Sequence, residues 1–323
     1  MKKSLQKILA TALVAGSLFA MPTVNAEVKT YEGTDEYVMS EFETIDTAKQ
    51  RAKQKAERAA QEKAGVFIES NTEVVNLKVT KDEVRTMTGG ILKIIDVVYQ
   101  LTPLSDGKSL IIRATVKADI DSDDINKWLN RGAAERADVV AKNLELQKAI
   151  EEQDKQIAEL KKKLADSEAR GEQEKISEQF AAEDKIFRSN QKLEEAMRFY
   201  YTGDLQNVAN YCTQAINLNP DNAAAYSIRG AAYYSLQNYN GAISDLNRAI
   251  DLNASDYKNF YNRGLAYVKL GDFRKAAADF SSAIKLNPND ADSWYNRGVC
   301  RQRLGDNYKA REDLQKAKSL GYR

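Results

Sequence analysis

Residues 261–280 read YNRGLAYVKLGDFRKAAADF, and residues 295–314 read YNRGVCRQRLGDNYKAREDL. The two stretches start with the same four letters and share a Leu-Gly-Asp turn. They begin 34 positions apart, from 261 to 295. Self-similarity at such a period indicates a chain built from one repeated supersecondary unit. The repeated stretch therefore decides the fold of the C-terminal part of the chain.

Small and aromatic residues extend the same period on both sides. The glycines are Gly230, Gly264 and Gly298, and each has an aromatic residue four positions before it: Tyr226, Phe260 and Trp294. Alanines follow in step at Ala242, Ala276 and Ala310, and again at Ala249, Ala283 and Ala317. Pro220 and Pro288, each after an asparagine, end the second helix of a unit. This pattern resembles the tetratricopeptide repeat (TPR) over residues 187–323.

The resemblance implies an all-α TPR solenoid with one degenerate and three clear repeats. The degenerate copy keeps Phe199, Gly203, Ala215 and Pro220 in register, but Ala196 stands at the glycine position. Small residues let the two helices of a hairpin cross closely, and the aromatic residue fills the space beside them. Because each hairpin leaves an apolar face uncovered, stacking of the units buries a continuous core.

An arginine precedes each repeated glycine, at a site where TPR units more often have leucine. An aspartate recurs sixteen positions later, which gives the pairs Arg229 with Asp245, Arg263 with Asp279, and Arg297 with Asp313. The arginines could form a row for anionic ligands or an Arg–Asp ladder that ties helix to helix. The ladder is favoured because both partners recur in step, and a paired guanidinium is not free for a ligand.

In TPR proteins the concave surface comes from the first helix of each hairpin. The resemblance places ten residues on that surface: Met197, Tyr200, Tyr201, Tyr234, Lys258, Tyr261, Asn262, Tyr295, Asn296 and Arg303. Tyrosines beside asparagines suit an extended peptide, and packing of these rings within the solenoid is the open alternative. The chaperone-tail clamp of some TPR proteins is not expected, because only Lys258 and Asn262 match it, with Glu194 and Ile228 at the earlier sites.

The N-terminus predicts export. Residues 1–26 read MKKSLQKILATALVAGSLFAMPTVNA, with three lysines ahead of an apolar run that ends at Ala20. This is the pattern of a secretory signal peptide, cleaved after Ala26. No segment reaches the ~20 apolar residues of a membrane span. We therefore expect a chain without an integral membrane span, in the periplasm of a bacterium or secreted.

Composition excludes several function classes. The chain has no histidine, so Ser-His-Asp and Cys-His catalysis and ordinary histidine metal sites are absent. It has no glycine-rich phosphate loop, and its formal net charge of +1 argues against nucleic-acid binding. We expect a protein without enzymatic activity, metal or cofactor. Cys212 and Cys300 lie too far apart in a regular stack for a disulfide, which predicts two buried free thiols.

Residues 27–120 predict a small α+β domain, one long helix on an antiparallel sheet. Alanines at every fourth position from 48 to 64 give the helix 45–64 a narrow stripe that faces the sheet. Alternating β-branched residues predict strands at 66–79, 91–101 and 110–120, and Thr80 caps a short helix. The other faces of the long helix are basic and are interpreted as solvated, with contact to envelope acids as the alternative: Lys49, Arg51, Lys53, Lys55, Arg58 and Lys63.

Three stretches of this region also resemble a known domain. AERAAQEKAGVFIESNTEV, TKDEVRTMTGGILK and LIIRATVKADI are similar to the N-terminal domain of flagellar assembly protein T and related secreted bacterial domains. The resemblance implies an envelope accessory domain and not a catalyst.

Residues 121–186 predict a helical connector. A helix capped by the stretch from Ser122 runs through Trp128 and continues almost without a breaker to Gly171. A coiled-coil period can be followed through Val139, Asn143, Leu146, Ile150, Ile157, Leu160 and Leu164, with Gln153 interrupting. Two interpretations stay open: a coiled coil that makes a homo-oligomer through residues 131–171, and a single helix held by charge pairs.

The predicted function is that of a secreted scaffold in the bacterial envelope. The TPR groove binds a protein or peptide segment, the connector spaces or oligomerises, and the α+β domain docks to another envelope component. The alternative is a structural oligomer that stacks through the TPR ends, because the sequence ends at Arg323 with no separate capping helix.

Overall fold

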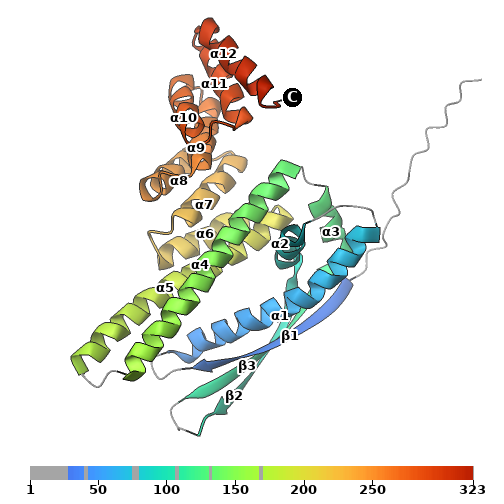
Figure 1. The fold of residues 1–323 in the computed structure, drawn as a ribbon, viewed down its shortest axis with the longest axis vertical. Coiled ribbons are helices and arrows are strands. Elements are labelled where there is room, and N and C mark those ends of the chain that lie inside the picture. Colours follow the sequence, from blue (N-terminus) through green and yellow to red (C-terminus); the bar gives the residue numbers. More distant parts are fainter. Residues whose placement is uncertain are drawn as a thin grey trace, which may run out of the picture.

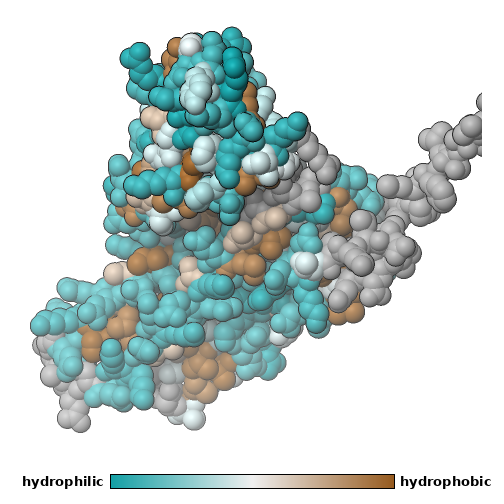
Figure 2. Space-filling model, turned by 45° about the horizontal axis from the view of Figure 1, so that its top comes forward, coloured by the Kyte–Doolittle hydropathy of each residue, from teal (hydrophilic) through white to brown (hydrophobic). Residues whose placement is uncertain are grey.

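The computed structural model describes residues 28–39, 43–74, 80–105, 109–130, 133–166 and 170–322. A three-stranded sheet and five helices form the lower part of the molecule, and a column of paired helices rises from it (Figure 1). The surface is mostly hydrophilic, with separate hydrophobic patches (Figure 2). The predicted signal peptide lies outside the described residues.

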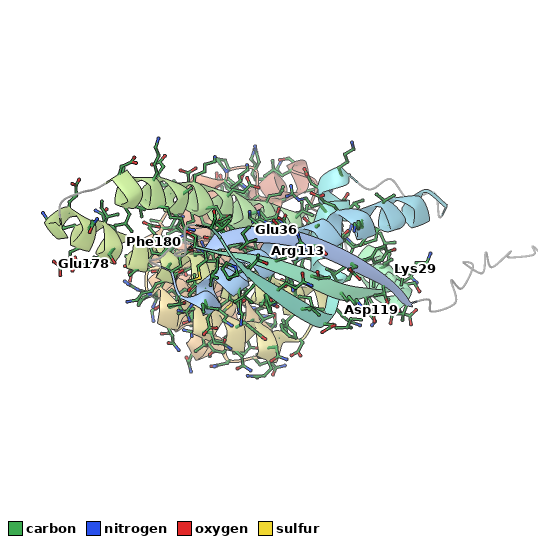
Figure 3. The ribbon with its side chains drawn as sticks, turned by 90° about the horizontal axis from the view of Figure 1, so that it is seen from below. Lys29, Glu36, Arg113, Asp119, Glu178 and Phe180 are labelled. Atoms are coloured by element: carbon green, nitrogen blue, oxygen red, sulfur yellow. The ribbon has the colours of Figure 1, made fainter. Side chains whose placement is uncertain are left out.

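The sheet is antiparallel, with strand order β1 (Val28–Met39), β3 (Leu110–Asp121), β2 (Lys93–Pro103). The inner face of β3 is buried at every second residue from Ile112 to Ile120. Its outer face is polar: Arg113 donates from Nε to Glu36 on β1 at 2.8 Å, and Thr30 donates to Asp119 at 2.6 Å (Figure 3). At β1 and β3, where α1 covers it, the sheet therefore has one packed face and one solvated face.

Helix α1 (Ile45–Val74) packs its alanine stripe on the inner face of the sheet. The five alanines of the stripe, from Ala48 to Ala64, are fully buried, as predicted. At Gly33 of β1, an added Cβ would lie 2.0 Å from the carbonyl oxygen of Ala56, so only glycine allows this close approach. Strand β1 and helix α1 thus make a close backbone contact at Gly33 and Ala56.

The predicted strand at 66–79 is wrong over 66–74, because α1 continues to Val74, and residues 75–79 lie outside the described part of the chain. Ile68 extends the four-residue stripe and is fully buried, so helical burial prevails over β-branched propensity there. The third strand is instead β1, which precedes the helix. The predicted strands at 91–101 and 110–120 correspond to β2 and β3.

Two short helices flank β2 and β3. Helix α2 (Lys81–Ile91) starts with the predicted cap: Thr80 accepts from the backbone N–H of Glu83, and the Glu83 side chain accepts from that of Thr80. Helix α3 (Ser122–Leu129) is capped by Asp121 and not by Ser122, because the Asp121 carboxylate accepts from the backbone of Asp123.

The predicted long connector is a helical hairpin. Helix α4 (Ala133–Asp166) ends before Gly171, and α5 (Arg170–Thr202) runs back along it (Figure 1). The coiled-coil stripe is buried inside this one chain at Val139, Leu146, Ile150, Ile157 and Leu164. Its polar members also bond in the same chain: Asn143 donates to Thr86 at 3.4 Å, and Asn190 donates to Gln153 at 2.9 Å. The stripe is therefore not an open seam for a second chain.

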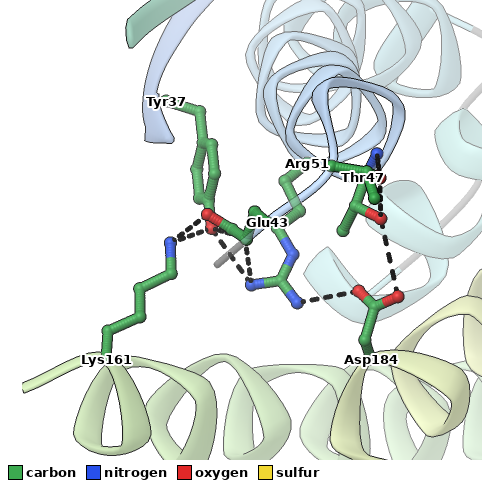
Figure 4. Close-up of polar contacts among 7 residues, drawn as sticks. Tyr37, Glu43, Thr47, Arg51, Lys161 and Asp184 are labelled. Atoms are coloured by element: carbon green, nitrogen blue, oxygen red, sulfur yellow. Dashed lines mark hydrogen bonds and ion pairs between the residues drawn. The ribbon is translucent and has the colours of Figure 1, made fainter. Parts of the chain in front are cut away.

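A buried charged cluster joins the sheet, α1 and the hairpin (Figure 4). Arg51, 3% exposed, donates to Tyr37 at 3.1 Å and lies 3.4 Å from both Glu43 and Asp184. Lys161 of α4 pairs with Glu43 at 2.7 Å. The prediction of a solvated basic face is therefore wrong for Arg51, since the hairpin covers it and pairs its charge.

Four hairpins form the column: α5 with α6 (Leu205–Leu218), α7 (Ala223–Ser235) with α8 (Tyr239–Leu252), α9 (Tyr257–Lys269) with α10 (Phe273–Leu286), and α11 (Ala291–Arg303) with α12 (Asn307–Ser319). An added Cβ at Gly264 would lie 2.9 Å from the Phe280 ring, and Gly230 and Gly298 are similarly tight against leucines. The helices of each clear hairpin do cross closely at the repeated glycine. The predicted boundary at residue 186 falls inside α5, which belongs to both the connector hairpin and the first repeat.

Candidate functional site

The three repeated arginines are held by aspartates across each hairpin. Each guanidinium makes two hydrogen bonds to its partner: 2.7 and 2.8 Å for Arg229 with Asp245, 2.9 and 2.7 Å for Arg263 with Asp279, and 2.9 and 2.8 Å for Arg297 with Asp313. Hydrogen bonding to the aspartates raises the pKa of Arg229 and Arg263. Two N–H groups of each guanidinium are thus bonded to a carboxylate, which leaves few free N–H donors for an anionic ligand.

Each of these arginines also reaches the preceding repeat. Nη1 donates to a side-chain oxygen on the second helix of that repeat, at 2.9 Å for Thr213, 2.7 Å for Asn247 and 3.2 Å for Ser281. The guanidinium lies over the repeated aromatic ring as well, 4.7 Å from the ring centroid in the case of Trp294. One arginine therefore ties three helices, within a hairpin and between hairpins.

The three predicted groove residues on α5 differ in their exposure and contacts. Tyr201 is buried and packs against Trp128 of α3 with ring centroids 5.0 Å apart. Its ring also fills the space beside Gly90 of α2. Tyr201 is therefore not a groove residue, because α5 uses that side to contact the N-terminal domain. Met197 is 2% exposed, and Tyr200 is half-buried.

The other predicted tyrosines are half-buried and in contact with neighbouring rings. Centroid distances are 5.7 Å for Tyr234 with Tyr239, 5.7 Å for Tyr261 with Phe280, and 4.0 Å for Tyr295 with Tyr322. Burial raises the pKa of the Tyr261 hydroxyl, which accepts from Asn296 at 3.4 Å. Each ring packs on the solenoid and keeps part of its surface exposed. Packing within the solenoid and contact with a peptide are therefore both compatible with its position.

Three predicted polar residues complete the set. Lys258 and Asn262 are half-buried on α9. Arg303 is exposed on α11, 5.9 Å from the centroid of the Phe273 ring.

One groove of about 460 Å³ lies between α4 and the first helices of three repeats. Its apolar floor comes from Leu146, Leu193, Met197 and Ile228. Its polar wall consists of side chains that are at least nine-tenths buried: Asn190, Asn222, Ser227 and Asn259. Of the ten predicted groove residues, this groove brings together only Met197 and Lys258.

The polar wall is pre-oriented by hydrogen bonds. Asn222 donates from Nδ2 to Ser189 at 2.9 Å and to Asn190 at 3.2 Å, and Ser227 donates to Asn259 at 2.6 Å. Sequence reasoning missed this wall. One sequence pattern could have indicated it: a polar residue recurs after 34 positions in the first turns of α9 and α11, at Asn259 and Ser293. Both side chains are buried in the structure. The contribution of α4 had no such signal, because α4 lies outside the repeat.

The cysteines are buried and free, as predicted. Burial raises the pKa of Cys212 to about 12 and that of Cys300 to about 11, so neither thiol ionises readily at neutral pH. In the described part of the chain, no cluster of three or more potential metal-ligating side chains is found. No helix there combines the length and apolar character of a membrane span.

Antiparallel helix pairs stacked at a fixed spacing define a helical-repeat solenoid. The family described as "Tetratricopeptide repeat" matches residues 261–321, and that described as "TPR repeat" matches residues 230–271. Residues 230–321 are therefore tetratricopeptide repeats, which confirms the resemblance seen in the sequence. No part of residues 27–120 falls within these matches, so the likeness to flagellar assembly protein T stays a prediction.

Solved TPR structures are similar to the chain over part of its length. The crystal structure of MamA shares 20% identity, with 48% of this chain and 95% of that chain covered and a TM-score of 0.40. YrrB, a TPR protein with an unusual peptide-binding site, shares 19% identity over 46% of this chain and 77% of that chain, with a TM-score of 0.39. The Arabidopsis OM64 TPR domain shares 28% identity over 36% and 98%, with a TM-score of 0.36.

Proposed function

We propose that the protein is a non-enzymatic adaptor that holds a protein segment in the groove between α4, α5, α7 and α9. The composition of this groove carries the proposal. An apolar floor lies beside buried amide and hydroxyl groups that are already oriented. A bound peptide needs both, since its side chains seek apolar area and its backbone needs hydrogen-bonding partners.

The charges around the groove narrow the class of segment. Lys142 and Lys258 are matched by Glu145 and Asp256 on the same lining. A strongly acidic or basic peptide would meet one like-charged pair, so we favour a segment with an apolar anchor and little net charge. Helix α4 closes one side of the groove, which limits the directions in which a segment can enter.

The test compares a tryptophan in the groove with a tryptophan elsewhere on the array. Peptides selected from a displayed random library on the purified chain are measured by fluorescence anisotropy. Ala224→Trp places a large ring at an exposed position of the groove, and Ala278→Trp makes the same change at an exposed position of α10 outside it. We expect Ala224→Trp to weaken binding at least about tenfold and Ala278→Trp to leave it unchanged. Peptides that bind both variants equally well, or a library without selected peptides, would refute the proposal.

We further propose that the adaptor acts outside the cytoplasm, in the bacterial envelope or as a secreted protein. The lysine-rich start and apolar run of residues 1–26 support this. In this proposal the α+β domain docks to another envelope component. Fractionation and the intact mass of the purified chain test the location, and we expect a mature chain that starts at Glu27 in the periplasm or the medium. A full-length chain in the cytoplasm would contradict it.

The stacking alternative is less well supported. The exposed side chains of α12 are polar or charged apart from Tyr308, with Arg311, Glu312, Lys316 and Lys318 among them. A charged outer surface is typical of a repeat that faces solvent. Stacking through this end would have to desolvate those charges.

A further inference from the structure

The two outer strands of the sheet differ sharply in charge. Among the described residues, β1 and β2 each pair only with β3, so each has one open edge. Strand β1 has acidic residues along its middle, Glu32, Asp35 and Glu36. Strand β2 reads VVYQLTP from Val97 to Pro103, with no charge at all. Proteins usually protect an open edge with charged side chains or proline, and β2 has neither over the six residues from Val97 to Thr102.

Strand β2 also exposes apolar side chains. Ile95, Val98 and Leu101 are 55%, 48% and 42% exposed. Figure 2 shows hydrophobic side chains gathered at the lower end of the molecule, near the hairpin of β2 and β3. Helix α1 covers β1 and β3, and Tyr99 of β2 instead borders an open hollow of about 400 Å³ together with Lys49 and Arg188. An added strand would find an unpaired backbone and uncovered apolar area on both faces.

We propose that β2 is an interaction surface for a second copy of this chain, with the two β2 strands antiparallel across a twofold axis. The two sheets would then form one continuous six-stranded sheet. The uncharged stretch from Val97 to Pro103 offers no ion pair to a charged partner, but it is compatible with a second copy of itself. With Tyr99 at the twofold axis, Val98 faces Gln100 and Val97 faces Leu101 of the other copy, so no like charges meet within the strand pair itself.

A second copy also closes the assembly. Twofold pairing covers the open β2 edge of both molecules at once and leaves the acidic β1 edges outside, where like charges oppose further pairing. A seven-residue strand pair is smaller than a standard interface of ~800 Å² per partner. The dimer should therefore be concentration-dependent, with dissociation in the micromolar range. The coiled-coil stripe of α4 does not contribute, because it is buried within one chain.

The test is the mass of the purified chain by light scattering from low to high micromolar concentration. Val98→Lys puts a charge on the β2 edge, and Val38→Lys puts the same charge on β1, at a side chain that is 54% exposed. We expect the wild type and Val38→Lys to approach twice the monomer mass and Val98→Lys to stay monomeric. A wild type that is monomeric throughout, or a Val98→Lys variant that dimerises as well as the wild type, overturns the proposal.

Hydrogen exchange on the wild type makes the result independent of any variant. Backbone amides of residues 97–102 that point to the open edge should exchange more slowly at high than at low protein concentration, and those of β1 should not change. Equal exchange at both concentrations would overturn the proposal even if Val98→Lys failed to fold. Ala224→Trp should leave the mass unchanged, which separates this surface from the proposed groove.

Discussion

The repeats and the N-terminal part of the molecule are held together in different ways. In the repeats, one contact recurs with new partners: an arginine on a first helix is held by an aspartate on the second, three times in register. In the N-terminal part, Arg51 meets Glu43 and Asp184 once, with no second copy anywhere in the described chain. A repeated contact reveals both partners in the sequence, whereas a unique contact becomes visible only in the structure.

The largest effect should come from breaking one step of the ladder. Asp279→Ala leaves the partly buried guanidinium of Arg263 without its carboxylate, so we expect the free energy of unfolding to fall by about 3 kcal/mol in urea titration. The double variant Arg263→Leu/Asp279→Ala should recover most of this loss, because leucine removes the unpaired charge. If Asp279→Ala unfolded at the same urea concentration as the wild type, the ladder would not tie the helices.

The next largest effect lies where the two parts meet. Gly90→Ala would put a Cβ 1.9 Å from the ring of Tyr201, so α5 must move away from α2. We expect a loss of about 2 kcal/mol in the free energy of unfolding. The adjacent Gly89→Ala is the control, since its Cβ would meet Gln61 at an ordinary 3.7 Å, and it should stabilise helix α2 by ~0.5 kcal/mol. Two glycine variants with the same effect would mean that the junction is not tightly packed.

The repeats could be predicted from the sequence because their period fixes partner, spacing and fold together. The N-terminal part could be predicted only where a local pattern was complete, as in the alanine stripe and the Thr80 cap. Strand β1 was missed because its charges and Gly33 hide the alternation. The heptad stripe of α4 left open both a partner helix and a single helix held by charge pairs. It could not show that the partner is α5 of the same chain.

The same distinction applies to the candidate groove: residues within the repeats could be predicted from the sequence, and residues outside them could not. Lys258 and Met197 were placed by the period of the repeats, but α4 supplies the opposite side of the groove from outside the period. Tyr201 was misplaced for a related reason. Its position in the repeat is that of a concave residue, and only the tertiary contact of α5 with Trp128 and Gly90 shows otherwise.

A smaller effect is expected at the last ring pair of the array. Tyr322 stacks on Tyr295 with centroids 4.0 Å apart. Tyr322→Ala should lower the free energy of unfolding by about 1 kcal/mol, the contribution of such a pair. Tyr308→Ala removes a ring that is 74% exposed and should leave the urea midpoint unchanged. Equal midpoints for both variants would show that the stacked pair adds nothing to the array.

The smallest effect tests a unique contact of the N-terminal part through its pH dependence. Burial raises the pKa of Glu194 above its ordinary value of 4.5, although Arg198 opposes the shift. A raised carboxyl pKa means that the folded state disfavours the charged form, so the penalty is present above the folded pKa and is lost as pH falls through it. Glu194→Gln keeps an acceptor for Gln54 and removes the charge. We therefore expect a higher melting temperature than wild type at pH 7 and no difference below pH ~4.

The neighbouring Glu195→Gln is the matched control for this pH effect. Glu195 is paired with Arg198 at 3.5 Å. The Glu195→Gln variant loses this ion pair, so its melting temperature at pH 7 should not exceed that of the wild type. A Glu194→Gln variant that melts below the wild type at pH 7 would mean that attraction to Arg198 outweighs burial. The contact between α1 and α5 at Gln54 and Glu194 would then be stabilised by its charges, as the ladder of the repeats is.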